Sequence, residues 1–314
     1  MNKRRIARTA VRRTVRPPMR RRRRRRPGFS FFLVTLLILA IALLYIFAGE
    51  LLFPSRDDNA VMPVEGEIIV TFIDVGQGDS ILVRDGNHAV LIDAGEHRAR
   101  QAVIDYLNEA GITFIDYVVA THPHSDHIGG LVTVLRDFDV GYVLMPDATN
   151  DTETFLNFLD AIENNDISTR FPSPGDRVQA GIIDMVVKGP EPGHHANLNN
   201  ASIVLRMQHG QTSFLFTGDA EVAAENWLVE TWGTSLQSNV LKVGHHGSRT
   251  STTESFLRTV NPAAAVIQSG EGNRHGHPHQ EVVDRLEAHG VTIYRNDQLG
   301  TIRMITNGQS IFTP

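Results

Sequence analysis

The chain has 314 residues, with 30 Lys and Arg, 35 Asp and Glu, and no cysteine. Its length allows one large domain or two small ones, and the lack of cysteine excludes disulfides and thiolate metal sites. Fourteen basic residues fall within the first 26 positions, whereas every acidic residue lies after residue 49. Beyond residue 49 the acidic residues outnumber the remaining 16 Lys and Arg by 19, so a basic and an acidic segment share one chain.

Residues 29–48, FSFFLVTLLILAIALLYIFA, form a run of 20 positions without a charge. A helix of that length spans roughly 30 Å, the thickness of a bilayer core. We therefore expect a single-pass membrane anchor at 29–49, after a basic cytoplasmic segment at 1–28 that contacts anionic lipids. The positive-inside rule places the rest of the chain outside the cytoplasm. A cleaved signal peptide is the alternative, but the apolar run is longer than a usual signal peptide core.

Residues 50–66 contain two prolines and scattered charges, and we expect them to link the anchor to a globular domain at 67–314. Runs rich in β-branched and apolar residues predict strands at 68–75, at 80–95 as a pair around an Asp-Gly-Asn turn, at 114–120 and at 140–146. Helical spacing of apolar residues predicts helices at 99–111 and at about 151–163.

The second half of the chain again mixes predicted strands and helices. It predicts a hairpin at 201–219, a helix at 220–232, and a strand at 239–248 that ends in a polar loop. A helix near 252, a strand at 263–270, a helix at about 280–289 and closing strands at 291–295 and 300–313 follow. Mixed strands and helices at short intervals, with polar loops at strand ends, predict a layered α/β fold.

The segment 121–130, THPHSDHIGG, carries four residues of metal-ligating type within six positions: His122, His124, Asp126 and His127. It directly follows the strand at 114–120, and in such a loop alternate side chains can converge on one point. We expect the first two residues to bind one cation and the last two a second. Imidazole together with carboxylate suits zinc, manganese or iron. A polar loop with chance histidines is the alternative, which this density of ligands disfavours.

The motif resembles the metallo-β-lactamase superfamily, and the segments VLIDAG (Asp93), FLFTGDAE (Asp219) and LKVGHHGS (His245 and His246) extend the resemblance. FIDVGQGDS, NNAS and GHPHQEV narrow it, because together with KVGHHGS they resemble the hydrolase domain of the ComEC/Rec2 competence proteins over about residues 68–313. The resemblance implies a four-layer αββα sandwich. It also implies a two-metal hydrolase site, with Zn²⁺ or Mn²⁺ as the two divalent ions, at one edge of the sheets.

Further roles are carried over from the resemblance. Asp219 is expected to bridge the ions, and His245 or His246 to be the last ligand. We favour His246, since a histidine followed by a small residue and Ser is typical of the superfamily; the other would then support a ligand or contact substrate. Asp93 is expected to support the ligands and not to bind a metal ion itself. Asp74 and Asp79 are expected in a tight loop beneath the site, where a Gly-rich structural turn is the alternative.

One segment departs from the superfamily pattern. Most two-metal members supply a third histidine to the first ion from a loop before the 201–219 hairpin, but here that position lies in NNAS. Asn200 and Ser202 are therefore expected as weaker, neutral ligands. His194 and His195 lie just upstream, in an expected surface loop.

The segment GNRHGHPHQEV, residues 272–282, adds further histidines in a loop flanked by Gly and Pro. The resemblance places His277 and His279 at the rim of the active site, where an imidazole could protonate a leaving oxygen or bind a phosphate. A solvent-exposed loop explains His275.

Together these features predict a membrane-anchored, extracytoplasmic metal-dependent hydrolase in which two cations activate water, with Asp126 taking part in catalysis. Phosphoesters are the expected substrates, and the resemblance makes DNA one candidate, although an excess of 19 negative charges after residue 49 is unusual for a nucleic-acid binder. The alternatives are a hydrolase of a non-phosphate ester or amide, and a non-catalytic surface-binding domain with a weakened metal site. No obligate protein partner is evident.

Overall fold

The structure, a computed structural model, describes residues 63–193 and 195–313. The basic segment and the membrane anchor predicted at 1–49 lie outside these residues, as does most of the predicted linker. Within the described part of the chain, no helix is long and apolar enough to cross a bilayer. The first described strand begins at Ile68.

Two β-sheets form the centre of the described domain. The first sheet has eight strands, in the spatial order β15 (Ile311–Phe312), β14 (Ile302–Thr306), β1 (Ile68–Phe72), β2 (Ile81–Asp85), β3 (His88–Ile92), β4 (Phe114–Val119), β5 (Asp139–Leu144) and β6 (Ser168–Arg170). The second has seven, in the order β13 (Thr292–Arg295), β12 (Ala264–Ile267), β11 (Val240–Lys242), β10 (Thr212–Phe216), β9 (Val204–His209), β8 (Ile183–Gly189) and β7 (Arg177–Ala180).

Each sheet joins an antiparallel half to a parallel half. In the first sheet the strands from β15 to β3 pair antiparallel, and those from β3 to β6 pair parallel. In the second, β7 to β10 pair antiparallel and β10 to β13 parallel. The parallel strands of both sheets therefore end in loops that lead into helices, and these loops are where parallel sheets carry ligand-binding residues.

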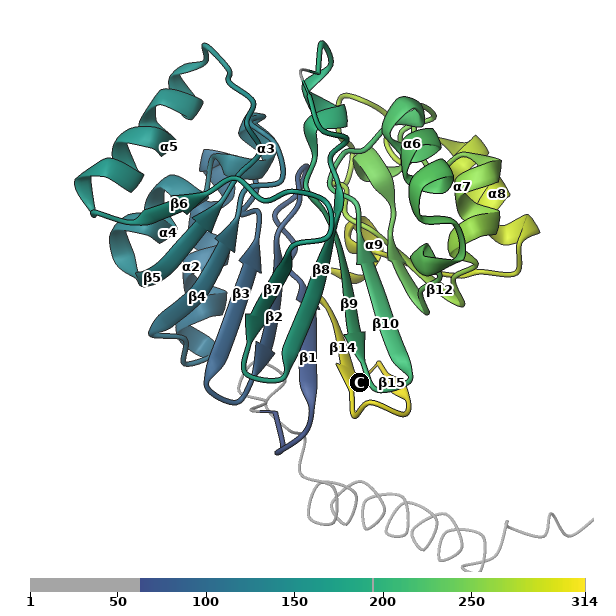
Figure 1. Cartoon of the computed structure of the whole chain (residues 1–314), viewed down its shortest axis with the longest axis horizontal. Helices are drawn as coiled ribbons and strands as arrows, with labels where there is room; N and C mark the ends of the chain where they lie inside the picture. The colour runs from purple at the N-terminus through teal and green to yellow at the C-terminus, as the bar shows by residue number, and fades with distance from the viewer. Residues whose placement is uncertain (1–62, 194, 314) are drawn as a thin grey trace, which may run out of the picture. The chain divides into compact units, whose positions relative to one another are not determined.

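Helices cover the outer face of each sheet (Figure 1). The first sheet is covered by α2 (Arg100–Glu109), α4 (Leu131–Asp137) and α5 (Glu153–Asn164), with the short α3 (Ser125–Ile128) at its edge. The second is covered by α6 (Val222–Trp232), α7 (Glu254–Val260) and α8 (Gln280–Ala288). A last short helix, α9 (Asn296–Leu299), and the 3₁₀ turns η1 (His97–Ala99), η2 (Leu198–Ala201), η3 (Gly233–Leu236) and η4 (Gly244–Gly247) complete the described elements.

The strand sequences explain why the layers stack in this way. Successive side chains of a strand point to opposite faces, and in β2 the residues Ile81 and Val83 join the core between the sheets while Leu82 joins the core under the helices. In β10, Phe214 and Phe216 face the other sheet and Leu215 faces the helices. Apolar side chains on both faces of these strands thus fill the cores on either side of each sheet, and the result is the αββα sandwich that the sequence predicts.

The chain between α5 and β9 differs from the sequence-based expectation. The structure places β6, β7 and β8 at 168–189, where no strand was predicted. β6 and β7 are edge strands of three and four residues whose outward side chains, such as Arg177 and Gln179, are polar. Such short, half-polar runs lack the apolar pattern that identifies a strand.

Substitution of Phe216 tests the core between the sheets. Its side chain is 1% exposed and its ring centroid lies 6.4 Å from that of Phe72 on the facing sheet. Phe216→Ala is expected to lower the free energy of unfolding by about 3–5 kcal/mol, the range for emptying a buried aromatic site. Denaturant unfolding followed by circular dichroism measures this. Phe171→Ala, at a side chain that is 58% exposed, is the control and should change stability by less than about 1 kcal/mol.

Glu225 predicts a dependence of stability on pH. This carboxylate of α6 is buried and accepts hydrogen bonds from the backbone N–H groups of Thr252 and Thr253, ahead of α7. Burial raises its pKa to about 7, against 4.5 in the unfolded chain. The folded state therefore binds the proton more tightly, and stability falls as pH rises from about 4.5 to 7.

We expect the wild-type protein to lose about 2 kcal/mol relative to Glu225→Gln between pH 5 and 7.5, from about 1.4 kcal/mol per pKa unit. Unfolding free energies measured across that range test this. Glu230→Gln, at an exposed position of the same helix, should follow the wild type. Parallel pH profiles for wild type and Glu225→Gln would refute a raised pKa at this position.

Candidate metal centre

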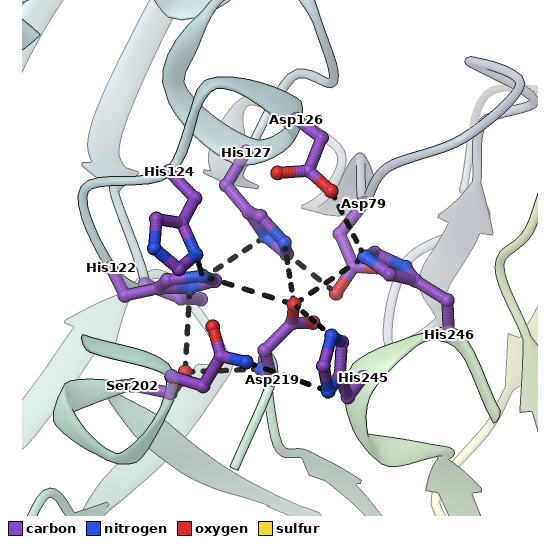
Figure 2. A network of polar contacts seen from close by, with 12 residues as sticks. Asp79, His122, His124, Asp126, His127, Ser202, Asp219, His245 and His246 are labelled. Atoms are coloured by element: carbon purple, nitrogen blue, oxygen red, sulfur yellow. Dashed lines mark hydrogen bonds and ion pairs between the residues drawn. The ribbon is translucent and has the colours of Figure 1, made fainter. Parts of the chain in front are cut away.

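The predicted ligands follow the ends of parallel strands in both sheets. Asp93 comes directly after β3, the 121–128 segment after β4, Asp219 after β10, and His245 with His246 after β11. Strands β3 and β4 belong to one sheet and β10 and β11 to the other. The side chains from both sheets meet at one edge of the sandwich, as Figure 2 shows.

The backbone around the ligands takes conformations that L-residues rarely adopt. Asp93, His245 and His246 all have positive φ, at 56°, 47° and 55°. A left-handed residue other than Gly costs roughly 1–2 kcal/mol, and two in succession turn both histidines of the 244–247 turn toward the site. Gly78 permits a close approach, because a Cβ there would lie 2.3 Å from the carbonyl oxygen of Asp126.

A single carboxylate oxygen is the point on which the imidazoles converge (Figure 2). Oδ2 of Asp219 lies 3.2 Å from Nε2 of His127 and 3.4 Å from Nε2 of His246. The same oxygen lies 3.8 Å from Nε2 of His122 and 3.8 Å from Nε2 of His245. Asp219 therefore stands where a bridge between two ions is expected.

The half-site formed by Asp126, His127, Asp219 and His246 has the spacing of a tetrahedral metal site. One ligand atom from each lies within 4.8 Å of all the others. Metal–ligand bonds of 2.0–2.2 Å place tetrahedral ligands about 3.3 Å apart. Nε2 of His246 lies 3.3 Å from Oδ2 of Asp126, close to that value.

Hydrogen bonds behind this half-site fix which ring nitrogens face inward. Asp93 Oδ2 accepts from Nδ1 of His127 at 2.8 Å, and the backbone oxygen of Gln268 accepts from Nδ1 of His246 at 3.0 Å. Both rings therefore present Nε2 as a lone pair. These two Nε2 atoms, and Oδ1 of Asp219, are buried without a hydrogen-bond partner. Buried polar atoms are normally satisfied, so the orphaned atoms fit a bound cation.

In the other half-site, the imidazole of His122 lies farther from the bridging carboxylate, with 3.8 Å between its Nε2 and Oδ2 of Asp219. Nε2 of His122 lies 3.0 Å from Nδ1 of His124, so these two nitrogens converge as predicted. His122 is fully buried, with its Nδ1 3.4 Å from Oγ of Ser202. These residues fit a second cation beside the first, held by two imidazoles and Asp219.

The buried carboxylates of the site favour the binding of positive charge. Burial opposes ionisation of Asp219, but His127 and His246 hold the pKa of Asp219 well below its usual value. Burial likewise opposes protonation of His127 and His246, yet the surrounding carboxylates, Asp219 foremost, hold the pKa of each ring well above its usual value. Without metal, protons on these rings neutralise the carboxylates, and a divalent cation would replace them.

Sequence reasoning missed Lys242, which lies beneath the site. This fully buried ammonium pairs with Asp79 and donates to the carbonyl oxygen of Gly218, next to the bridging aspartate. Asp79 Oδ1 in turn lies 3.2 Å from Nδ1 of His246. In the sequence, Lys242 stands in an apolar strand three positions before His245, and a lysine inside a buried strand is the signal that would have revealed it.

Three of the predicted residues lie outside the ligand clusters. Oδ1 of Asn200 accepts from the backbone N–H groups of Glu221 and Ala224, so it fixes the chain after Asp219. Oγ of Ser202 accepts from the N–H of Asp219 at 3.0 Å. Asp74 is exposed, and its Oδ1 accepts from the N–H of Gly76, so it belongs to a turn and not to the residues that support the ligands.

In the 272–282 segment, the ring of His277 lies beside His245 and His246. The ring of His277 lies 5.4 Å from that of His245 and 4.9 Å from that of His279, centroid to centroid. Nδ1 of His277 is buried without a partner, and that of His279 accepts from the N–H of Arg249. Burial and the neighbouring histidines lower the pKa of His277 to about 3. Its ring is therefore neutral at pH 7, which suits a hydrogen-bonding group rather than a cationic acid.

Comparison with known proteins assigns this fold and site to a family. The sequence pattern of the metallo-beta-lactamase superfamily matches residues 73–271, and the chain belongs to that superfamily. It is 34% identical over 257 residues to ComE operon protein 3 of Bacillus subtilis and 34% identical over 241 residues to competence protein ComA of Neisseria gonorrhoeae. The matches cover 76% of this chain but only 33% and 32% of those relatives, so the chain spans about a third of their length. The predicted resemblance is confirmed.

Solved structures share the fold at low sequence identity. The diiron β-hydroxylase CmlA of Streptomyces venezuelae superposes with a TM-score of 0.52 and 15% identity, covering 76% of this chain and 54% of CmlA. The metallo-beta-lactamase fold protein YhfI of Bacillus subtilis gives a TM-score of 0.50 and 12% identity, covering 79% and 99% of the two chains.

Asp93 is expected to control metal affinity without touching the ion. In Asp93→Asn, an amide replaces the oxygen that accepts from His127, and the ring loses its fixed tautomer. Asn tolerates the positive φ at this position. We expect metal affinity to fall about 10–100-fold, measured by competition with a chromogenic chelator. Asp116→Asn is the control, because Asp116 also binds a histidine, His88, away from the metal cluster. Equal affinities in both variants would contradict this role.

Proposed function

We propose that this protein is a membrane-anchored, metal-dependent hydrolase that cleaves phosphoesters. The observation that carries the proposal is that the orphaned Nε2 atoms of His127 and His246 lie 3.2 Å and 3.4 Å from Oδ2 of Asp219. Superfamily membership supports it, because the site occupies the place where the superfamily resemblance predicts two divalent ions.

The ligand roles divide between two ions. His122 and His124 would hold one, Asp126, His127 and His246 the other, and Asp219 both. Bound divalent ions at such a site supply a water nucleophile at neutral pH and stabilise charge on the leaving oxygen. The mixture of imidazole and carboxylate suits Zn²⁺ or Mn²⁺. His277, whose neutral ring lies beside His245, would donate a hydrogen bond to a substrate oxygen.

The surroundings of the site favour a small or short phosphoester. A cavity of about 360 Å³ is lined by Gln77, next to the Gly78 that packs on Asp126, and by Arg98 and Arg274. Arginine suits phosphate recognition, but Glu96 and Glu271 line the same cavity. The excess of 19 acidic residues after residue 49 also opposes binding along a length of nucleic acid. DNA is a candidate because of the competence relatives, and a short single strand fits this site better than a duplex.

The membrane anchor and its orientation rest on the sequence alone. The uncharged run at 29–48 supports a single span, and the arginines before it support a cytoplasmic N-terminus that contacts anionic lipids. The domain would then act outside the cytoplasm.

Asp126→Ala tests the proposed hydrolase. This change removes a ligand whose Oδ2 lies 3.3 Å from Nε2 of His246, so metal-dependent release of nitrophenol from bis-p-nitrophenyl phosphate is expected to fall at least 100-fold. Asp160→Ala, at an exposed position of α5, should keep wild-type activity. Equal rates in the two variants would sink the proposal, and a wild-type protein with no bound metal would favour the alternative of a non-catalytic binding domain.

A substrate panel separates the remaining classes. Single-stranded DNA, duplex DNA, RNA, small phosphoesters, a lactone and a β-lactam would each be tested with Zn²⁺ and with Mn²⁺. We expect turnover of the small phosphoesters first and of single-stranded DNA before duplex DNA. Turnover of the lactone or β-lactam alone would replace the phosphoester assignment with a carboxylic ester or amide.

A further inference from the structure

Among the described residues of NNAS and the chain just before it, no histidine offers a third imidazole to the half-site of His122 and His124. Within NNAS, the side-chain oxygens of Asn200 and Ser202 accept from backbone N–H groups of the chain around Asp219. His195 is turned away, because its Nε2 lies 2.8 Å from the carbonyl oxygen of Glu191, four residues before it. The place that a third histidine fills in most superfamily members must therefore be filled from elsewhere or by a weaker group.

His245 approaches that half-site from the other side of Asp219. Its Nε2 lies 3.8 Å from Oδ2 of Asp219, the same distance as Nε2 of His122. His246, the next residue, directs its Nε2 at Asp126 and Asp219 in the other half-site. The two consecutive left-handed residues thus place both imidazoles near Oδ2 of Asp219, and of the two it is His246 that also lies close to Asp126.

A carboxylate fixes the tautomer of His245. Oε1 of Glu221 lies 3.0 Å from Nδ1 of His245, and Oγ1 of Thr250 lies 3.2 Å from the same nitrogen. A carboxylate only accepts hydrogen bonds, so Nδ1 carries the proton and Nε2 presents its lone pair to the site. This repeats the arrangement of Asp93 with His127, and such carboxylate–histidine pairs are typical of metal ligands.

Asn197 and the NNAS segment hold that carboxylate in place. Nδ2 of Asn197 donates to Oε2 of Glu221 at 2.8 Å, and Nδ2 of Asn199 donates to Oε1 at 3.0 Å. Asn200 binds the backbone N–H of the same residue. Three asparagines, Asn197 and the two of NNAS, therefore orient Glu221.

We propose that His245 is the third imidazole ligand of the first metal ion, and that Glu221 is the residue that positions it. The proposal rests on the two-metal site of the proposed function and completes it. The first ion then has three imidazoles and Asp219, with one histidine displaced from the usual loop to the turn after β11. His245 and His246 thereby act on different ions, which resolves the choice between them that the sequence left open.

Removal and chemical rescue of the imidazole test this assignment. His245→Gly keeps the positive φ of 47° without strain and leaves a hole where free imidazole can enter, since the side chain is 23% exposed. Zn²⁺ bound per full-length chain, measured by plasma mass spectrometry after gel filtration, is expected to fall from two to one. Added imidazole should restore the second ion. His275→Gly, at the exposed rim, is the matched control and should bind two ions with or without imidazole.

Glu221→Gln tests the positioning role. The neutral amide is a weaker hydrogen-bond acceptor for Nδ1 of His245 than the carboxylate. The affinity of the weaker ion is therefore expected to drop about 10–100-fold, while saturating Zn²⁺ still gives two ions per chain. Glu230→Gln, on the same helix and exposed, should leave both affinities unchanged.

The outcomes separate this proposal from the proposed function. Two tightly bound ions in His245→Gly would overturn the proposal and leave the hydrolase intact. Loss of one ion in Asn199→Ala but not in His245→Gly would overturn it too, because Oδ1 of Asn199 is buried without a partner and is the competing ligand. Loss of one ion from His245→Gly without imidazole rescue, together with an unchanged Glu221→Gln, would assign His245 to folding only and would also overturn it. A wild-type protein without metal would instead overturn the proposed function.

Discussion

The buried negative charge at the edge of the two sheets is the constraint on which the rest of this structure depends. Asp79, Asp93 and Asp219 are almost fully buried, and Asp126 adjoins them. Lys242 is a buried counter-ion that pairs with Asp79 of this group. An isolated carboxylate costs several kcal/mol to remove from water, so the remaining charge must be met by cations at the imidazole-lined face. The histidines and their partners are arranged around that requirement.

The fold meets this requirement by bringing strand ends together from both halves of the chain. Each sheet changes from antiparallel to parallel pairing near its centre, at β3 in one and β10 in the other. The loops that carry Asp93 and Asp219 follow these two strands, and those that carry the other ligands follow the next strand along, β4 or β11. The apolar core between the sheets holds the four loops in fixed register, which a site with ligand spacings near 3.3 Å requires.

How much of this could be predicted depended on how far apart in the chain the interacting residues lie. His122, His124, Asp126 and His127 lie within six positions, and their spacing alone indicated a metal site. Asp79 pairs with Lys242, 163 positions later, and Glu221 meets His245 across 24; neither pair shares a local pattern, so only the fold reveals it. Asp74 and Asp79 stand in one Gly-rich loop, and nothing in their spacing tells that one carboxylate points to solvent and the other to His246. Strands β6 and β7 escaped prediction because short edge strands with polar residues carry little apolar signal.

The 244–247 turn shows what the site costs the fold. Two consecutive histidines in left-handed conformation cost roughly 1–2 kcal/mol each. Packing alone does not explain why histidine stands at these positions, because glycine would adopt the same backbone conformation without strain. Strained backbone of this kind persists at functional sites where surrounding structure fixes it; here Glu221 and the carbonyl oxygen of Gln268 hold the two rings. Because carboxylate repulsion and backbone strain both weaken the metal-free state, whereas a cation that binds only the folded site stabilises it, metal binding and folding are linked at this turn. A glycine at either position would relieve the backbone strain and would remove the imidazole for which the strained turn exists.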